Sequence, residues 1–192
     1  MKKRIYFLLS LISISLVVCS FSYIDKEKQT SLQSRDVILK EESIRPKMQV
    51  VFLLDATGSM SGLIGAAKEK IWSITSSLTQ TDPAPEIEVG MIFYRDRGDE
   101  FITKTIPLGT DLDNLYEKLM AIQAGGGGDA PESVNQALYE GVTKIQWDDK
   151  ESTYKVIFLV GDCPPHMDYK DDVKYPESCS EATKKGIVVN TI

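Results

Sequence analysis

The sequence predicts an α/β protein with a doubly wound, mostly parallel central sheet that is flanked by helices. Short apolar runs alternate along the chain with segments whose apolar residues recur every three or four positions. Residues 49–54 are the first such run and are typical of a strand buried on both faces. Residues 63–78 follow with the periodicity of an amphipathic helix. Strands that alternate with helices favour a parallel sheet covered on both faces.

The later elements repeat this alternation. Strands are predicted at residues 87–94, 101–107, 154–160 and 187–192, and helices at 112–122, 131–145 and 178–185. A polar turn around Gly98 predicts an antiparallel hairpin between the second and third strands. Pro131 is expected at the first position of its helix, and Gly186 just after the end of another. Residue 192 falls in the fifth strand, which we expect to form an open edge.

The chain divides into three predicted regions, of which the first is a targeting segment over residues 1–24. Three basic residues at positions 2–4 precede a run without charge at 5–24, a pattern typical of a secretory signal. A lipid anchor at Cys19 and an uncleaved membrane anchor stay open as alternatives. Residues 25–47 are a polar linker with a short helix expected at 37–42, and residues 48–192 form the folded domain. We therefore expect an exported protein that is extracellular, periplasmic or membrane-anchored.

Length and charge limit the classes of function. The chain has 192 residues, 42% of them hydrophobic and 26% charged, which suits about one globular domain and excludes a wholly disordered protein. Its 28 acidic residues outnumber 22 basic ones, giving a net charge of −6. Such a surface does not favour nucleic acid, and it suits a cation or a partner with a basic face.

Five oxygen-bearing residues are predicted to converge at one edge of the sheet. Asp55, Thr57 and Ser59 follow the first strand, Asp129 follows a run of four glycines, and Asp162 ends the fourth strand. Ligands bind at the carboxyl ends of strands in such sheets, and Mg²⁺ or Mn²⁺ prefers oxygen ligands. The alternative is that Thr57 or Ser59 only caps a helix. Each residue taken singly favours the cap, but the five together favour a metal site.

The segment Asp-Ala-Thr-Gly-Ser-Met at residues 55–60 resembles the metal-ion-dependent adhesion site of von Willebrand factor type A domains. Gly126–Asp129 and Val160–Asp162 fall where that family carries its other two metal loops, and the resemblance covers residues 48–192. It implies Mg²⁺ or Mn²⁺ bound by Asp55, Thr57, Ser59, Asp129 and Asp162. Two features depart from the family. Asp129 stands in for the usual threonine, and family domains run on to a further helix and strand.

The resemblance implies a binding module rather than an enzyme. The metal would complete its shell with a carboxylate from a partner protein, as in cell adhesion. The alternative is an aspartate-dependent, phosphatase-like hydrolase with Asp55 as nucleophile. Haloacid-dehalogenase-type phosphatases carry a second aspartate two positions later, where this chain has Thr57, so the general acid is missing. The chain also lacks a P-loop, a nucleophile elbow and a zinc motif.

Several neighbouring residues have two interpretations. Arg95 and Asp96 either order the metal loop or lie in a solvated turn, and the turn is favoured. The sole histidine, His166, either reaches the rim of the metal site or lies on the loop surface, which is favoured. Residues 168–172 are an acidic loop that is either a second cation site or, as favoured, a solvated face. Cys163 and Cys179 are either a disulfide or two buried thiols.

Overall fold

The computed structural model of the protein describes residues 46–82 and 84–192. The predicted targeting segment at 1–24 and the short helix expected at 37–42 lie outside these residues. Within the described ranges, none of the helices has both the length and the apolar character that crossing a membrane requires.

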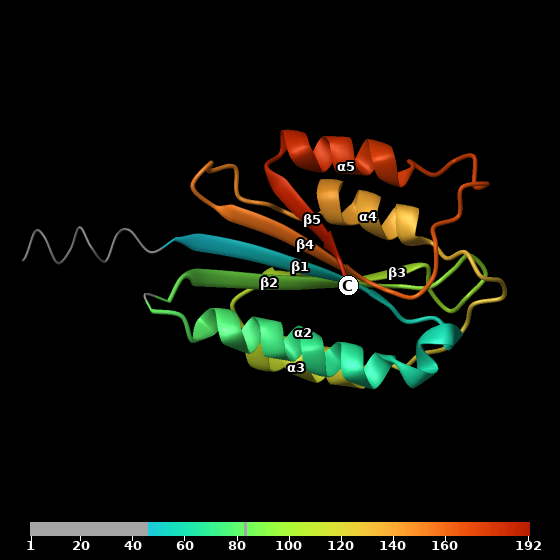
Figure 1. Cartoon of the computed structure of the whole chain (residues 1–192), viewed down its shortest axis with the longest axis horizontal. Helices are drawn as coiled ribbons and strands as arrows, with labels where there is room; N and C mark the ends of the chain where they lie inside the picture. The colour runs from blue at the N-terminus through green and yellow to red at the C-terminus, as the bar shows by residue number, and fades with distance from the viewer. Residues whose placement is uncertain (1–45, 83) are drawn as a thin grey trace, which may run out of the picture. The chain divides into compact units, whose positions relative to one another are not determined.

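The described residues form five strands, four α-helices and one 3-10 turn (Figure 1). In chain order they are β1 (Lys47–Asp55), η1 (Gly58–Gly62), α2 (Ile64–Thr79), β2 (Glu86–Tyr94), β3 (Thr103–Gly109), α3 (Leu112–Ala121), α4 (Val134–Thr143), β4 (Tyr154–Val160), α5 (Tyr175–Lys184) and β5 (Ile187–Thr191). Each strand and helix predicted from periodicity is present, with boundaries that shift by a few residues.

The strands form one mixed sheet in the order β3-β2-β1-β4-β5. Only β3 is antiparallel, paired with β2 as the predicted hairpin, while β1 pairs in parallel with both β2 and β4. Figure 1 shows α2 and α3 on one face of the sheet and α4 and α5 on the other. The predicted doubly wound α/β fold is confirmed. From β1 the chain builds the sheet first to one side and later to the other, so a topological switch point lies between β1 and β4.

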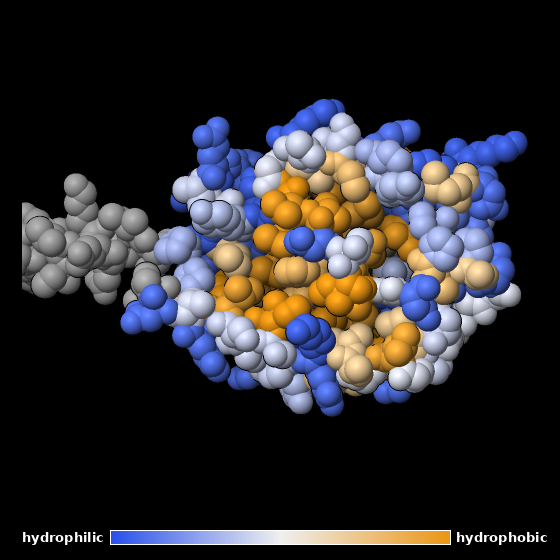
Figure 2. All heavy atoms as spheres, viewed as in Figure 1, coloured by the Kyte–Doolittle hydropathy of each residue, from blue (hydrophilic) through white to orange (hydrophobic). Residues whose placement is uncertain are grey.

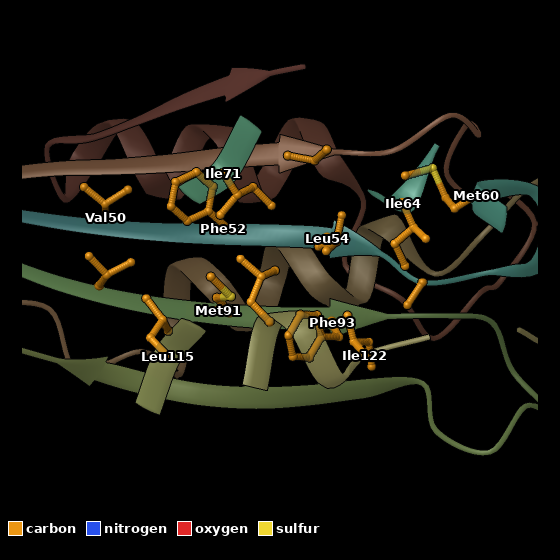
Figure 3. Close-up of a cluster of buried hydrophobic side chains, with 14 of the residues drawn as sticks. Val50, Phe52, Leu54, Met60, Ile64, Ile71, Met91, Phe93, Leu115 and Ile122 are labelled. Carbon is orange, nitrogen blue, oxygen red and sulfur yellow. The ribbon is translucent and has the colours of Figure 1, made fainter. Parts of the chain in front are cut away.

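The central strand β1 explains the apolar run with which the domain begins. Val50, Phe52 and Leu54 pack toward α2 and α3, as Figure 3 shows, whereas Val51 and Leu53 pack toward α4. All five side chains are at most 1% exposed. Burying a side chain of this size contributes about 1.5–3 kcal/mol, so β1 holds the two layers together and fixes where its carboxyl end lies.

One helix start differs from the prediction. α4 begins at Val134 rather than at Pro131. The Glu132 N–H donates to the Pro164 carbonyl at 2.9 Å, and the Glu132 carbonyl accepts from His166 N–H at 3.1 Å. These bonds pair the loop before α4 with the loop after β4, so the backbone at Glu132 is not free to join a helix.

The start of α5 differs from the predicted start, whereas its end agrees with the prediction. The helix begins at Tyr175, three residues before the predicted start, with Pro176 in its first turn, where a missing N–H costs nothing. Gly186 follows the helix with φ +66°, as predicted for a residue that must adopt a left-handed conformation.

Strand β5 is the outer strand on its side of the sheet. Val188 on this strand is 56% exposed, and Ile192, just after it, is 51% exposed. Figure 2 shows apolar side chains gathered in the middle of the face on which the C-terminus is marked in Figure 1. The described residues therefore leave apolar surface uncovered beside β5.

Candidate metal centre

Four of the five predicted ligands come together at the carboxyl ends of β1 and β4. Asp55 Oδ1 accepts hydrogen bonds from the Thr57 backbone N–H at 2.8 Å and from its hydroxyl at 2.6 Å. The Thr57 and Ser59 hydroxyl oxygens are 3.1 Å apart, and the Ser59 hydroxyl donates to Asp162 Oδ1 at 2.9 Å. One chain of oxygens thus links the loop after β1 to the loop after β4.

The alternative of helix capping does not describe these hydroxyls. Thr57 precedes η1, but its side chain makes no capping bond to the described backbone of that turn. Its hydroxyl donates to Asp55 instead, and that of Ser59 donates to Asp162. Their oxygens therefore face one another across the end of the sheet, as ligands of one cation would.

The arrangement fits a hard divalent cation. Adjacent ligands of an octahedral Mg²⁺ at 2.0–2.1 Å lie about 2.9 Å apart, and the linked oxygens here are 2.6–3.1 Å apart. Asp55 is 0% exposed, and its Oδ2 has no hydrogen-bond partner among the described residues. Burial raises the pKa of Asp55 and the Asp162 charge adds to the rise, whereas the Thr57 hydrogen bonds and the nearby Tyr94 hydroxyl oppose it. A cation would relieve both the burial penalty and the repulsion.

Asp129, the fifth predicted ligand, lies with a different set of residues. Its side chain is 62% exposed, and its Oδ1 is 3.8 Å from His166 Nε2. Asp129, Asp96 and His166 each place one ligand atom within 4.8 Å of the others. Within the part of the chain that the structure describes, no hydrogen bond joins Asp129 to the chain of oxygens at Asp55.

Glu132 is a carboxylate that sequence reasoning did not select. The Glu132 side chain is 2% exposed. It lies beside the Thr57 side chain, because a Cβ placed on Gly127 would be 2.9 Å from Glu132 Oε1 and 3.4 Å from Thr57 Cβ. Its Oε2 is buried without a partner in the described region. Burial raises the pKa of Glu132 to about 7, and the charges of Asp55, Asp96 and Asp99 add to the rise. Its place three residues after Asp129, in the same glycine-rich loop, was the available signal.

The glycine-rich loop is held against the loop after β1 by backbone contacts. Gly126 and Gly127 have φ of +78° and +74°, which residues with a Cβ rarely adopt. The Gly126 carbonyl accepts from Gly58 N–H at 3.0 Å, and Gly127 N–H donates to Asp99 Oδ2 at 2.9 Å. The glycines therefore hold this loop, which also carries Glu132, beside Thr57.

Arg95 and Asp96 are buried, 8% and 4% exposed, so the favoured prediction of a solvated turn is wrong. Arg95 Nε donates to the Ala56 carbonyl at 3.0 Å, and its Nη2 donates to the Gln123 carbonyl at 2.9 Å. Ala56 belongs to the metal loop and Gln123 precedes the glycine-rich loop. Arg95 thus orders both loops, because it supplies donors to carbonyls that no regular strand or helix satisfies.

The acidic loop at 168–172 is also not simply a solvated face. The Arg97 guanidinium donates to Asp171 and Asp172 and lies 4.1 Å from the centre of the Tyr169 ring. Its positive charge thus offsets part of the negative charge of the loop. The Asp172 side chain is only 6% exposed. The loop therefore packs against the turn after β2 through this ion pair.

His166 is 3% exposed, which corrects the prediction that it lies on the loop surface. Cys163 and Cys179 are both free thiols in the described structure. Cys163 Sγ lies 3.7 Å from the Ser59 hydroxyl oxygen, and burial raises its pKa. The structure therefore agrees with two separate thiols rather than with a Cys163–Cys179 disulfide.

The chain is similar in sequence to a known domain family and to parts of two longer proteins. The von Willebrand factor A domain model matches residues 49–192. Von Willebrand factor A domain-containing protein 7 of Rattus norvegicus is 35% identical over 95 residues, 50% of this chain and 10% of that protein. Alpha-protein kinase vwkA of Dictyostelium discoideum is 26% identical over 145 residues, 74% of this chain and 23% of that protein. The chain thus spans at most about a quarter of the length of these curated relatives.

Solved structures with a similar fold include two bacterial proteins. The conserved hypothetical protein BatB of Bacteroides thetaiotaomicron has a TM-score of 0.56 and 22% identity, covering 75% of this chain and 65% of its own. The pilus adhesin SpaC of Lactobacillus rhamnosus GG has a TM-score of 0.54 and 16% identity, and the match covers 77% of this chain and 24% of the adhesin chain. These likenesses support the fold. The family match, which spans three quarters of the chain, shows that this protein belongs to the von Willebrand factor A domain family.

Proposed function

We propose that the domain is a divalent-metal-dependent protein-binding module of an exported or cell-surface protein. Von Willebrand factor A domains generally mediate protein–protein interaction, and the finer proposal is that Mg²⁺ or Mn²⁺ carries the contact here. The single observation on which it depends is Asp55 Oδ2, buried without a hydrogen-bond partner in the described residues at the base of a chain of oxygens. Asp55, Thr57, Ser59 and Asp162 would hold the metal.

The site has a buried base and an exposed mouth. Asp55 and Thr57 are 0% exposed at its base, whereas Ser59 and Asp162 are exposed at its mouth. A side chain from a partner could therefore approach over Ser59 and Asp162. The metal, when bound, would supply an electrophilic position for a carboxylate of that partner.

The local charge supports metal dependence. Asp55 and Asp162 lie on the same chain of oxygens, and Glu132 lies beside Thr57. Without a cation these carboxylates would repel an acidic partner at short range. With a divalent cation the repulsion falls, so the same surface would change from rejecting a carboxylate to accepting one.

The alternative of a phosphatase-like hydrolase is not supported by the geometry. A phosphoryl-accepting aspartate must reach its substrate, and Asp55 is 0% exposed with one oxygen held by Thr57. The kinase named among the relatives matches over 23% of its own length. The proposal that the protein is exported is supported by the signal-like pattern of residues 1–24. A pilus adhesin is also among the proteins of similar fold.

The experiment uses Mn²⁺ as a paramagnetic probe and acetate as a model of the partner carboxylate. Mn²⁺ bound to the full chain enhances water-proton relaxation while a water occupies its open position, and acetate should lower that enhancement by replacing the water. The Asp55→Ala variant should lose this acetate-sensitive component, while Asp113→Ala, in α3 and exposed, should keep it. An acetate response that is unchanged by Asp55→Ala would contradict the proposal.

A further inference from the structure

A second group of ligand atoms lies beside the first site, supplied by three separate loops. Asp96 follows β2, Asp129 lies in the glycine-rich loop, and His166 lies in the loop after β4. One ligand atom of each lies within 4.8 Å of the others. Asp96 and His166 are buried, and Asp129 is exposed. The group is therefore held on two sides by the protein and reached by solvent on the third.

The tautomer of His166 follows from its hydrogen bond. Nδ1 lies 2.8 Å from Asp168 Oδ1, and a carboxylate can only accept, so Nδ1 carries the proton of the neutral ring. The ring also stacks on Tyr169, with centroids 3.9 Å apart and an interplanar angle of 11°. Both contacts fix the direction of the ring, and they leave Nε2 with a lone pair.

That lone pair faces two carboxylates. His166 Nε2 lies 3.4 Å from Asp96 Oδ2 and 3.8 Å from Asp129 Oδ1, and its side chain is 4% exposed. Nε2 is buried and has no hydrogen-bond partner among residues 46–82 and 84–192. In the neutral ring a buried lone pair that faces two anionic oxygens is unfavourable. Two things would remove this conflict: a proton on Nε2, which forms an ion pair with Asp96 and Asp129, or a metal ion held between the three atoms. A proton and a metal ion would therefore compete for Nε2.

We propose that Asp96, Asp129 and His166 form a second metal site, which binds a divalent transition-metal ion such as Zn²⁺. Ligands at about 2.0–2.1 Å in a tetrahedral Zn²⁺ site lie about 3.4 Å apart, close to the 3.4 Å and 3.8 Å separations here. Imidazole nitrogen favours Zn²⁺ over Mg²⁺, so this site and the all-oxygen site at Asp55 differ in the metal they select. Three protein ligands leave a position for water.

The residues around the group are those that orient metal ligands in known sites. A histidine ligand usually donates its other ring N–H to a carboxylate, as His166 does to Asp168. Asp96 is oriented in the same way, since Oδ1 accepts from the Ser133 hydroxyl at 2.8 Å and Oδ2 from the Tyr169 hydroxyl at 2.9 Å. Such a metal would tie together the three loops that also border the first site.

The test measures Zn²⁺ binding to the full chain by calorimetry, in buffer whose millimolar Mg²⁺ occupies the oxygen site. Loss of a residue that only orients a ligand costs about tenfold or more in metal affinity, so removing a ligand should cost at least that. Asp129→Asn and His166→Gln should both weaken Zn²⁺ binding by at least this factor. Asp129→Asn should fold, because its side chain is 62% exposed. Asp113→Asn is the matched exposed control.

The chain has one histidine, so its imidazole signals in a ¹H–¹⁵N spectrum report directly on His166. Zn²⁺ should shift the Nε2 signal while Nδ1 stays protonated. Asp55→Ala should abolish the response to Mg²⁺ and leave Zn²⁺ binding unchanged, which separates this proposal from that of the adhesion-type site. Zn²⁺ binding that is insensitive to Asp129→Asn and His166→Gln would overturn it. So would an Asp129→Asn variant that loses Mg²⁺ binding and keeps Zn²⁺ binding.

Discussion

Replacing Glu132 by glutamine should stabilise the metal-free protein at neutral pH. Glu132 is 2% exposed, and burial together with the charges of Asp55, Asp96 and Asp99 raises its pKa from 4.5 to about 7. The folded state therefore keeps this proton at pH values where the unfolded chain has released it. Stability contributed by the protonated form is complete below about pH 4.5 and is lost as the pH rises toward 7.

The size of the effect follows from the shift. A difference of about 2.5 between the two pKa values corresponds to about 3 kcal/mol once the pH is above 7. Glutamine has nearly the shape of the protonated acid and cannot ionise, so Glu132→Gln should recover most of this free energy at pH 7.5 and little at pH 4.5. A change of 3 kcal/mol is a large share of the stability of one domain.

Urea unfolding in the presence of a chelator measures the free energy of unfolding at the two pH values, and equal slopes confirm a comparable transition. Glu140→Gln is the matched control with the opposite sign. Burial alone would raise the pKa of Glu140, but hydrogen bonds from Lys144 and Thr103 hold it below its ordinary value. Its charged form therefore stabilises the fold above about pH 4.5, and Glu140→Gln should destabilise the protein at pH 7.5. If Glu132→Gln destabilises the protein equally at both pH values, the argument from burial is wrong.

Three further outcomes are expected. Mg²⁺ at one hundred times its dissociation constant should stabilise the wild type and Asp113→Ala by about 2.7 kcal/mol in thermal unfolding, whereas Asp55→Ala should lose this metal-dependent shift even if it is more stable without metal. Arg95→Ala should cost about 2–4 kcal/mol in urea unfolding, because it removes charged donors from the Ala56 and Gln123 carbonyls. A loss under 1 kcal/mol would show that water and the remaining Gly125 N–H, which donates to Ala56, are sufficient. Cys163 and Cys179 should both be alkylated in the unfolded, unreduced protein; peptide mapping that finds them joined would contradict the structure.

The fold could be predicted because its signals are local. The strand β1 is buried on both faces and therefore reads as a continuous apolar run, while α3 alternates buried and exposed positions with a helical period. Asp111 accepts from Asn114 N–H at the start of α3, as a cap at that position should. Such features depend on neighbours within a few residues, so periodicity is enough to place the elements.

The predicted ligands that lie together are those at, or within a few residues of, the end of a strand. Asp55 is the last residue of β1, and Asp162 lies two residues after β4. The parallel register of these strands brings their ends together, and both carboxylates lie in the chain of oxygens. The start of α4 was missed because Glu132 pairs with a loop about thirty residues away. His166 was expected on the surface because Asp96, which lies against its Nε2, comes from a loop far away in the sequence.

The glycine-rich loop shows why the assignment of its carboxylates requires the structure. Asp129 and Glu132 are three residues apart, and either could have faced Asp55. Gly126 and Gly127 turn the chain through positive φ, and the bonds of Glu132 to the loop after β4 fix the direction in which it leaves the turn. Glu132 is thereby buried beside Thr57, and Asp129 points toward His166. One loop therefore contributes a carboxylate to each cluster, and its direction is set by contacts with loops far away in the sequence.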